Sequence, residues 1–473
     1  MRTSIILLFL ISFLVVWSCT SINRDEKSRA GDISEWMTNG DMSSLFAEST
    51  NKLFFFGAEN DSLAVLELDT TRQYQTVDGF GFALTGGSAL LLNQKLAADQ
   101  RTKLLKELFQ FDSNNIGISY LRISIGASDL DDHVFSYNDL PLGKTDISLS
   151  NFNIKEDQKH LIPVLKEILL LNPDIKIMGS PWSAPAWMKN NNSMKGGSLQ
   201  LQYYTVYANY LVKYIRAMEA EGIPIDAITL QNEPENPKNN PSMLMNAAEQ
   251  ALFVKRYLGP AFQMAGIEAK IIVFDHNCDH PEYPISILDD KEAKKFIDGS
   301  AFHLYLGDIN VLSDVHNAHP DRNVYFTEQW TWSKGNFDGD LRWHTKNLII
   351  GAMRNWSRTV LEWNLAADPN QNPHTDEGGC TECLGALTIG DSVSRNVSYY
   401  IIAQASKFVR PGSVRVASNL VDGLPNVAFV TPSGKKVLIV LNDSDHITTF
   451  AIRFKGKTAV ASLSKGAVGT YLW

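Results

Sequence analysis

Short apolar runs alternate with helical patterns along most of the chain. Eight runs have the length and residue types of buried β-strands, and they lie at 76–82, 120–125, 176–180, 227–231, 271–275, 300–305, 323–327 and 359–363. Between them, apolar residues recur at intervals of three and four, which predicts helices at 99–109, 157–171, 203–221, 247–263 and 344–355. Eight strands joined by helical crossovers favour an α/β fold with a closed (β/α)8 TIM barrel over an open sheet.

The pattern changes near residue 414. Strand-like segments at 427–431, 436–441, 448–454 and 470–473 are separated by turn residues and predict a small antiparallel β-domain. The segment 62–73 is also strand-like and is expected to pair with that domain. We therefore predict a barrel over 76–405 and a side β-sandwich domain over 406–473, to which strands from 51–75 contribute.

The first residues resemble an export signal. Arg2 precedes an apolar run at 5–17, which is short for a bilayer span. Ser18 directly before Cys19 is similar to a bacterial lipoprotein signal, in which the chain is cut before Cys19 and its thiol is acylated. A plain secretory signal or a membrane anchor is the alternative. We expect a signal at 1–18, a polar tether at 19–50, and an exported protein that touches the outer membrane only through its lipid anchor.

The composition excludes two classes of protein. The 473 residues carry 43 basic and 52 acidic side chains, with a net charge of -9, and the acid is spread along the chain. Nucleic-acid binding needs clustered Lys and Arg, so it is excluded. The hydrophobic content of 44% and the aromatic content of 10% exclude a disordered chain.

Three cysteines follow Cys19. An exported protein can form disulfides, so Cys380 and Cys383 are a candidate disulfide pair. Zinc is the competing interpretation, but one C-x-x-C lacks a second ligand pair and the nearby His374 does not supply it. We expect no metal there, and we expect Cys278 to be a buried free thiol.

Two glutamates come directly after predicted strands. Glu233 follows the fourth run and Glu328 follows the seventh. Catalytic groups of a barrel project from the carboxyl ends of its strands, and these two strands face each other across a closed barrel. Retaining glycoside hydrolysis needs such a pair, one nucleophile and one acid that later acts as a base, about 5 to 5.5 Å apart. Either glutamate alone would be better explained as a solvated or salt-bridged loop carboxylate.

The other strand ends carry polar and aromatic residues suited to a sugar. Asn232 could donate to a sugar 2-hydroxyl, and Trp182 could stack on a pyranose ring, although a single tryptophan is equally well explained by core packing. The candidate substrate-binding residues are Arg122, Asp129, Trp182, Asn232, His303, Tyr305, Trp363 and Asn364.

In this order, the motifs resemble those of glycoside hydrolase family 30, the family of lysosomal glucosylceramidase and microbial β-1,6-glucanases. The matching segments are 77–82, 121–124, 180–189, 231–234, 327–328, 363–366, 406–413 and 471–473. The resemblance implies a retaining β-glycosidase in which Glu233 is the acid/base and Glu328 the nucleophile, with no metal or organic cofactor. Since the acid must begin protonated, we expect a raised pKa for Glu233 beside a charged Glu328.

Two loops depart from glucosylceramidase. The segment 235–243 is polar and bounded by prolines, and the loop 368–388 carries the Cys380 and Cys383 pair, which is similar to the β-1,6-glucanase branch. We therefore expect an endo-β-1,6-glucanase acting on β-glucan. The alternatives are a glucosylceramidase, an exo-β-glucosidase or a β-xylosidase of the same family. A non-catalytic glycan-binding lipoprotein is an alternative from another class, against which the presence of both glutamates argues.

Overall fold

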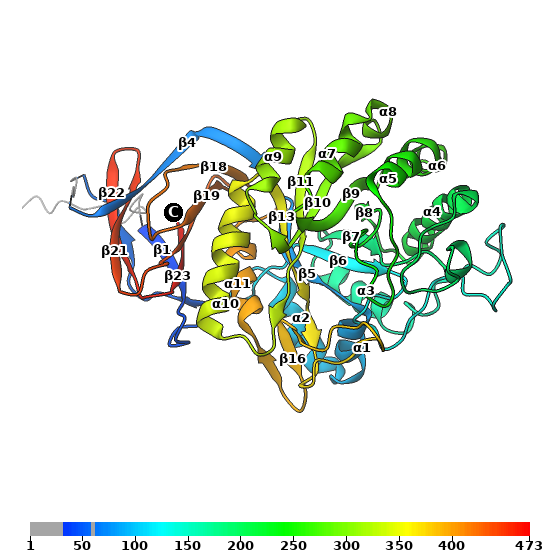
Figure 1. Ribbon diagram of the computed structural model, residues 1–473. Coiled ribbons are helices and arrows are strands. Elements are labelled where there is room, and N and C mark those ends of the chain that lie inside the picture. Colours follow the sequence, from blue (N-terminus) through cyan, green and yellow to red (C-terminus); the bar gives the residue numbers. More distant parts are fainter. Residues whose placement is uncertain (1–31, 58–61) are drawn as a thin grey trace, which may run out of the picture.

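The computed structural model describes residues 32–57 and 62–473. The chain forms a barrel and a sheet-rich domain that lie side by side, with the sheet-rich domain at the left of Figure 1. The predicted signal at 1–18, Cys19 and the first part of the predicted tether lie outside the described residues. Within the described ranges, no helix has the length and apolar character needed to cross a membrane.

Eight parallel strands close into the barrel in chain order, so the barrel prediction is confirmed, and each predicted run overlaps one strand of the barrel. The strands are β5 (Gly79–Ala83), β6 (Tyr120–Ile125), β7 (Lys176–Pro181), β8 (Ala227–Thr229), β9 (Lys270–Cys278), β10 (Ile297–Gly307), β11 (Asn323–Glu328) and β13 (Ser357–Asn364). Their near-continuous apolar character follows from burial on both faces, by the barrel interior and by the helices.

The helices pack around the outside of the barrel (Figure 1). In α4 the buried residues Tyr207, Leu211 and Tyr214 recur every three or four positions and form one apolar face. The helices are α1 (Gly86–Gln94), α2 (Ala98–Phe109), α3 (Leu161–Leu171), α4 (Tyr204–Ala220), α5 (Ala247–Phe253), α6 (Gly259–Ala265), α7 (Glu282–Asp289), α8 (Lys291–Lys294), α9 (Val311–Ala318), α10 (Phe337–His344) and α11 (Val397–Ser406). Wider π-helical turns at Val254–Leu258 and Thr345–Ala352 interrupt the predicted helices 247–263 and 344–355.

The sheet-rich domain is one sheet that folds over its own core. Its order is β2-β1-β23-β20-β19-β18-β4-β21-β22, and β3 pairs with β1. Residues from strands at both ends of this order, among them Ile33, Ile452 and Ala461, meet in one buried cluster with Leu438 of the central β20. The strands are β1 (Asp32–Thr38), β2 (Ala47–Glu48), β3 (Leu53–Phe54), β4 (Ala64–Thr76), β18 (Val414–Ser418), β19 (Asn426–Val430), β20 (Lys436–Leu441), β21 (Thr448–Phe454), β22 (Lys457–Leu463) and β23 (Val468–Leu472).

Segments from both ends of the chain build this domain. β4 pairs with β18 on one side and with β21 on the other, which confirms the pairing expected for 62–73. The predicted tether, in contrast, is wrong for its described part. β1 pairs with β23 over five residues, with Trp36 opposite Thr470, and Ile33 has no exposed surface. The polar residues of this short strand concealed it, and the domain begins no later than residue 32 rather than at 51.

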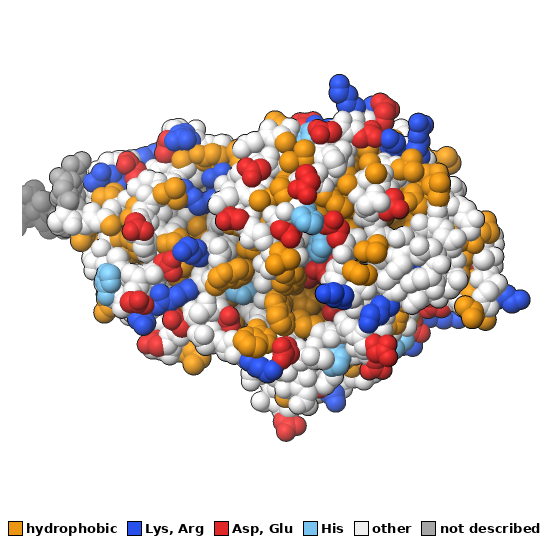
Figure 2. Space-filling model, in the orientation of Figure 1, with side chains coloured by type: hydrophobic (Ala, Val, Ile, Leu, Met, Phe, Trp, Pro, Cys, Tyr) orange, Lys and Arg blue, Asp and Glu red, His pale blue; other side chains and the backbone are white. Residues whose placement is uncertain are grey.

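Acidic and basic side chains are interspersed over the face shown in Figure 2, without a continuous basic surface on that face. Binding along a phosphate backbone requires a basic stripe or patch, which this face does not present.

We predict that Ile33→Ala lowers the free energy of unfolding by about 2 to 5 kcal/mol, because it leaves a cavity in the core of the β-domain. Urea denaturation followed by circular dichroism measures the change. Ile447→Ala is the matched control, because Ile447 is 69% exposed, and it should change the unfolding free energy by less than about 0.5 kcal/mol. Equal effects of the two substitutions would contradict the place of β1 in the sheet.

Candidate active site

The carboxyl ends of the barrel strands bring Glu233 and Glu328 together. Glu328 is the last residue of β11, and Glu233 lies in the loop after β8. A carboxylate oxygen of each lies within 4.8 Å of the other, and the two residues are only 6% and 5% exposed. This separation agrees with the spacing of a retaining pair, about 5 to 5.5 Å between carboxyl groups, and leaves too little room for the water of an inverting enzyme.

Irregular backbone directs the site side chains inward. Glu233 has a positive φ of 44°, and its N–H donates to the carbonyl of Asp275 at 3.0 Å. Phe274 and Asp275 also have positive φ, 71° and 72°, and the pairing of β9 with β10 skips Asp275. Such a β-bulge re-aims a side chain, and a left-handed backbone at a non-glycine residue costs energy that the surrounding structure must supply.

Arg122 lies at the centre of a buried network below the two glutamates. Its guanidinium has no exposed surface and donates to Glu328 Oε2 at 2.6 Å and to Asp275 Oδ2 at 2.7 Å. It also donates to the amide oxygen of Asn232 at 2.7 Å. Sequence reasoning placed Arg122 among the substrate-binding residues, whereas the structure places it behind them, where it orients Glu328 and Asn232.

Sequence reasoning missed Asp275, which anchors the same network. Its carboxylate accepts hydrogen bonds from Arg122 and His303. The hydroxyls of Thr229 and Thr327 each donate to it at 2.7 Å, and that of Ser180 donates at 2.8 Å. Burial opposes ionisation of Asp275, but Arg122 and His303 outweigh it and hold the pKa of this carboxyl well below its usual value. Asp275 ends the predicted run 271–275, so the strand-end rule that selected the two glutamates could have found it.

His303 lies between the two glutamates and Asp275. Its Nδ1 is 3.4 Å from Glu233 Oε1 and 3.6 Å from Glu328 Oε1, and its Nε2 is 3.2 Å from Asp275 Oδ1. Burial disfavours the charged imidazole, yet the negative charge of Glu328 and the hydrogen bonds to Asp275 and Glu233 raise the pKa of His303 to about 9. The side chain is fully buried, so it contacts the carboxylates and not the cavity.

The expected rise in the pKa of Glu233 is wrong for this state of the site. Burial disfavours the Glu233 carboxylate, but the hydrogen bond and charge of His303, with smaller effects from His276 and Asn236, lower its pKa to about 2. The prediction from the sequence considered the charge of Glu328 but not that of the His303 imidazolium, which lowers the pKa of Glu233. With Glu233 ionised and His303 protonated, the proton must pass from His303 Nδ1 to Glu233 Oε1, 3.4 Å away, before Glu233 can act as an acid.

Glu328 is held for nucleophilic attack by two donors. Arg122 binds Oε2, and the Tyr305 hydroxyl donates to Oε1 at 2.8 Å. Burial is the largest influence and, with the charge of Glu233, raises the pKa of Glu328, although His303, Arg122 and Tyr305 oppose the rise. These contacts fix both oxygens of the carboxylate while leaving the residue at the floor of the cavity.

A cavity of about 380 Å³ opens above the two glutamates. Trp182 and Trp363 form part of its wall as a stacked pair, with ring centroids 5.5 Å apart. Burial and the charges of Glu328 and Glu233 raise the pKa of Asp129 to about 8, so this carboxyl is neutral at pH 7 and can donate as well as accept. The lining comprises Asp129, Trp182, Glu233, Asn239, Tyr305, Glu328, Trp330, Trp363, Cys380 and Cys383.

The remaining candidates fall into two groups. Asn232 is 3% exposed beside Glu233, and because its oxygen faces Arg122 its amide N–H groups are directed away from that cation. Asn364 is buried at the end of β13 and does not line the cavity. Asn239 and Trp330 line the cavity but were not among the residues predicted from the sequence. Trp330 follows the nucleophile by two residues, so the period-two pattern of an extended strand would have indicated it.

The cysteines lie as predicted. Cys380 and Cys383 form a disulfide at the edge of the cavity, and Cys278 is a buried free thiol. The disulfide removes both thiolates as zinc ligands. Glu233, His303 and Glu328 have donor atoms within 4.8 Å of one another, but a metal ion there would lie next to the Arg122 guanidinium, which disfavours a further cation.

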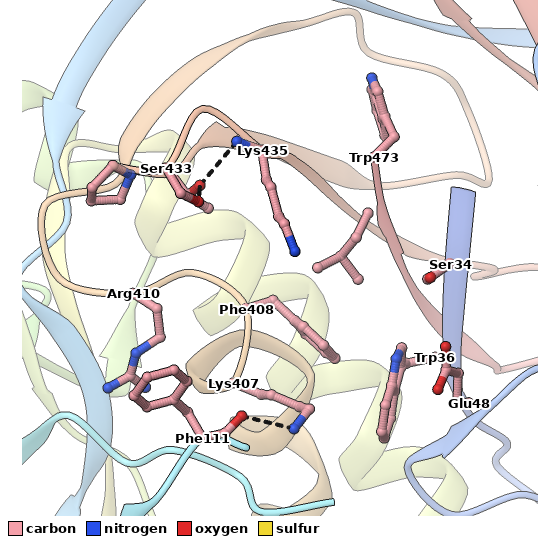
Figure 3. Close-up of a pocket in the computed structure, with 13 residues that line it drawn as sticks. Ser34, Trp36, Glu48, Phe111, Lys407, Phe408, Arg410, Ser433, Lys435 and Trp473 are labelled. Carbon is pink, nitrogen blue, oxygen red and sulfur yellow. Dashed lines mark hydrogen bonds between the residues drawn. The ribbon is translucent and has the colours of Figure 1, made fainter. Parts of the chain in front are cut away.

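A larger cavity, of about 640 Å³, lies between the β-domain and the barrel (Figure 3). It is lined by Trp36, Phe408 and Trp473 together with basic side chains, and Glu48 is its one acidic residue. Lys407 is engaged by the backbone carbonyls of Phe111, Ser113 and Asn115. This cavity lacks a pair of carboxylates, so the hydrolytic chemistry belongs to the smaller one.

Two family models match almost all of the described chain. The Glycosyl hydrolase family 30 TIM-barrel domain matches residues 77–409, and the Glycosyl hydrolase family 30 beta sandwich domain matches residues 412–471.

Individual proteins agree with the family matches. The chain is 34% identical to endo-1,6-beta-D-glucanase neg1 of Aspergillus fumigatus, with 82% of each chain covered, and 36% identical to an endo-1,6-beta-D-glucanase of Neurospora crassa, with 78% of this chain and 79% of that one covered. It is 28% identical to the lysosomal acid glucosylceramidase of Mus musculus, over 86% of this chain and 83% of the relative. The solved structure of the endo-beta1,6-glucanase BT3312 matches with a TM-score of 0.87 at 32% identity, over 94% of this chain and 99% of that one.

We predict that His303→Asn moves the alkaline limb of the pH dependence of kcat/KM to lower pH, by about one unit or more. At neutral pH, Glu233 and His303 together hold one proton, which is lost as the pH rises through the pKa of His303 at about 9. An amide cannot hold that proton, so the acid form is lost at lower pH. Initial rates measured across the pH range with an aryl β-glucoside give the profile.

His319→Asn is the control, since His319 is buried beside Asp289 and Lys294 and is not part of the catalytic network. It should leave the alkaline limb unchanged. An unchanged limb in a folded His303→Asn variant would show that Glu233 does not share its proton with His303.

Proposed function

The chain belongs to glycoside hydrolase family 30, and on this basis we propose that it is a retaining endo-β-1,6-glucanase. The observation that carries the proposal is the pair of buried carboxylates, Glu233 and Glu328, within 4.8 Å at the base of an aromatic cavity. The stacked faces of Trp182 and Trp363 suit the apolar face of a sugar, and the neutral Asp129 carboxyl and the Asn232 amide suit its hydroxyls.

The reaction proceeds in two displacements. In the first, the Glu328 carboxylate attacks the anomeric carbon while Glu233, having received the His303 proton, protonates the departing glycosidic oxygen. The bond from the anomeric carbon to the leaving glucan breaks, and a covalent glycosyl-enzyme forms. In the second, Glu233 removes a proton from water as the water oxygen attacks the anomeric carbon and releases Glu328. Two inversions give net retention.

The β-1,6 linkage is supported by the relatives and by the loops. The two fungal proteins named as endo-1,6-beta-D-glucanases are 34% and 36% identical to this chain, whereas the lysosomal acid glucosylceramidase is 28% identical. At the cavity, the polar loop 235–243 contributes Asn239 and the loop 368–388 contributes the Cys380–Cys383 disulfide, and these are the two loops in which the sequence departs from glucosylceramidase.

Export and lipid anchoring form a separate proposal. The apolar run at 5–17 and the Ser18-Cys19 pair support a lipoprotein signal that leaves Cys19 as the acylated first residue of an outer-membrane protein. The Cys380–Cys383 disulfide fits an oxidising compartment such as the periplasm or the cell surface.

We predict that the purified enzyme converts β-1,6-glucan into a ladder of oligosaccharides and that Glu328→Gln slows this reaction by about 1,000-fold or more, because it removes the nucleophile. Chromatography of the products over time measures both the ladder and the rate. Glu35→Gln is the matched control: Glu35 is a buried glutamate of the β-domain, remote from the cavity, and its loss should leave the rate unchanged.

Three outcomes would contradict this proposal. Release of glucose alone from the first minutes would indicate an exo-enzyme, and cleavage of glucosylceramide but not of β-1,6-glucan would indicate the glucosylceramidase branch. A first product of inverted anomeric configuration in proton NMR would overturn the roles of Glu233 and Glu328.

We predict that the full chain incorporates radiolabelled palmitate when it is expressed in a Gram-negative bacterium, and that Cys19→Ala abolishes the label because it removes the acylated thiol. Cys278→Ala should keep the label, since Cys278 is buried in the folded barrel. Equal labelling of the Cys19→Ala form and the unaltered chain would exclude a lipoprotein signal.

A further inference from the structure

An exposed tryptophan lies at the rim of the catalytic cavity. Trp332 is 44% exposed and, with Thr331, forms β12 (Thr331–Trp332), four residues after the nucleophile. β12 pairs with β15 (Cys383–Leu384), so that Trp332 lies opposite Cys383, whose side chain lines the cavity. Directly paired residues project to the same face of a ribbon, so the Trp332 indole extends the cavity wall outward.

The burial of the neighbouring residue in β12 also indicates that the Trp332 side chain points along the cavity wall. Thr331 is 2% exposed, and its hydroxyl donates to the carbonyl of Leu384 at 3.0 Å. Trp330 directly precedes β12, so Trp330 and Trp332 flank the inward-facing Thr331 in the sequence. Trp330 already lines the cavity, which makes Trp332 the next aromatic surface in the direction away from Glu328.

The Trp332 ring is held in one orientation. Its Nε1 donates to Glu382 Oε2 at 3.0 Å, and the Lys334 ammonium pairs with the other oxygen of Glu382 and lies 6.0 Å from the centre of the ring. Glu382 belongs to the four-residue turn that the Cys380–Cys383 disulfide closes. A side chain that is already ordered loses little conformational entropy when it binds a ligand.

We propose that Trp332 is a distal glucan-binding subsite, in which its indole stacks on the apolar face of a glucose unit of a chain that also occupies the catalytic cavity. Glu382 and Lys334, at the edge of the ring, present an acceptor and a donor to the hydroxyls of that unit. A single exposed aromatic residue is ordinary on a protein surface, and the assignment rests instead on the rim position and the anchored ring. This subsite rests on the proposed function and extends it, because it binds a glucose unit of the polymer away from the cleaved bond.

The test compares a long and a short substrate. With β-1,6-glucan, Trp332→Ala should raise KM about tenfold, which corresponds to about 1.4 kcal/mol of lost binding, and should leave kcat unchanged. With 4-nitrophenyl β-glucoside, which reaches only the sites beside Glu328, both constants should be unchanged. Trp332→Phe, which keeps a flat ring but loses the hydrogen bond to Glu382, should recover part of the affinity for polymer.

Trp343→Ala is the matched control. Trp343 is 40% exposed on α10 and is not among the side chains that line the cavity, so its loss should change neither substrate. Thermal denaturation of each variant verifies folding. If Trp332→Ala has the same KM for the polymer as the unaltered enzyme, or if it affects both substrates equally, the distal subsite is overturned.

The unaltered enzyme tests the proposed function in the same experiment. If the unaltered enzyme does not cleave β-1,6-glucan but cleaves a 1,3- or 1,4-linked β-glucan, the linkage proposal fails. The distal subsite is then tested on that polymer, by comparing the KM of Trp332→Ala with the KM of the unaltered enzyme. If it cleaves no polymer, both the endo-glucanase proposal and the distal subsite are overturned.

Discussion

The fully buried guanidinium of Arg122 is the interaction on which the catalytic site depends. It neutralises Asp275 and orients Glu328, and through the oxygen of Asn232 it also sets the direction of an amide beside Glu233. A buried charge is costly unless it is paired, and removing one partner of such a pair costs about 3 to 5 kcal/mol. The same contacts that make Arg122 tolerable in the interior therefore fix the nucleophile, so stability and catalysis share one network.

The barrel places the strand ends together, but regular strands would not aim all of these side chains inward. The bulge at Asp275 turns its carboxylate toward Arg122 and His303, and the N–H of Glu233 donates to the Asp275 carbonyl while Glu233 itself adopts a left-handed backbone. The unfavourable backbone at Glu233 and at Phe274–Asp275 is thus compensated by hydrogen bonds and ion pairs of the network. Strained backbone and buried charge therefore occur at the same positions. The ion pairs and hydrogen bonds hold the strained backbone in place, and the strained backbone directs the charged side chains toward their partners.

The barrel and the catalytic glutamates could be predicted from sequence because both follow from local patterns. Apolar runs define the strands, and Glu233 and Glu328 stand where two of them end. β1 could not be predicted in this way, since the pattern DISEWMT has little apolar alternation and gains its stability from distant partners in β23. The charge state of Glu233 was mispredicted for a related reason: the pKa depends on His303, which lies 70 residues away and approaches only in the folded barrel.

The same electrostatics explain how one residue serves as acid and then as base. While Glu328 carries its charge, it helps to keep the proton on His303, next to Glu233. Formation of the glycosyl-enzyme converts Glu328 into a neutral ester, which removes the largest influence that raises the pKa of His303 and removes the repulsion between Glu233 and Glu328. Glu233, which has just given up its proton to the leaving group, is then stabilised as a carboxylate and can accept a proton from water. The covalent step itself therefore prepares the site for the second displacement.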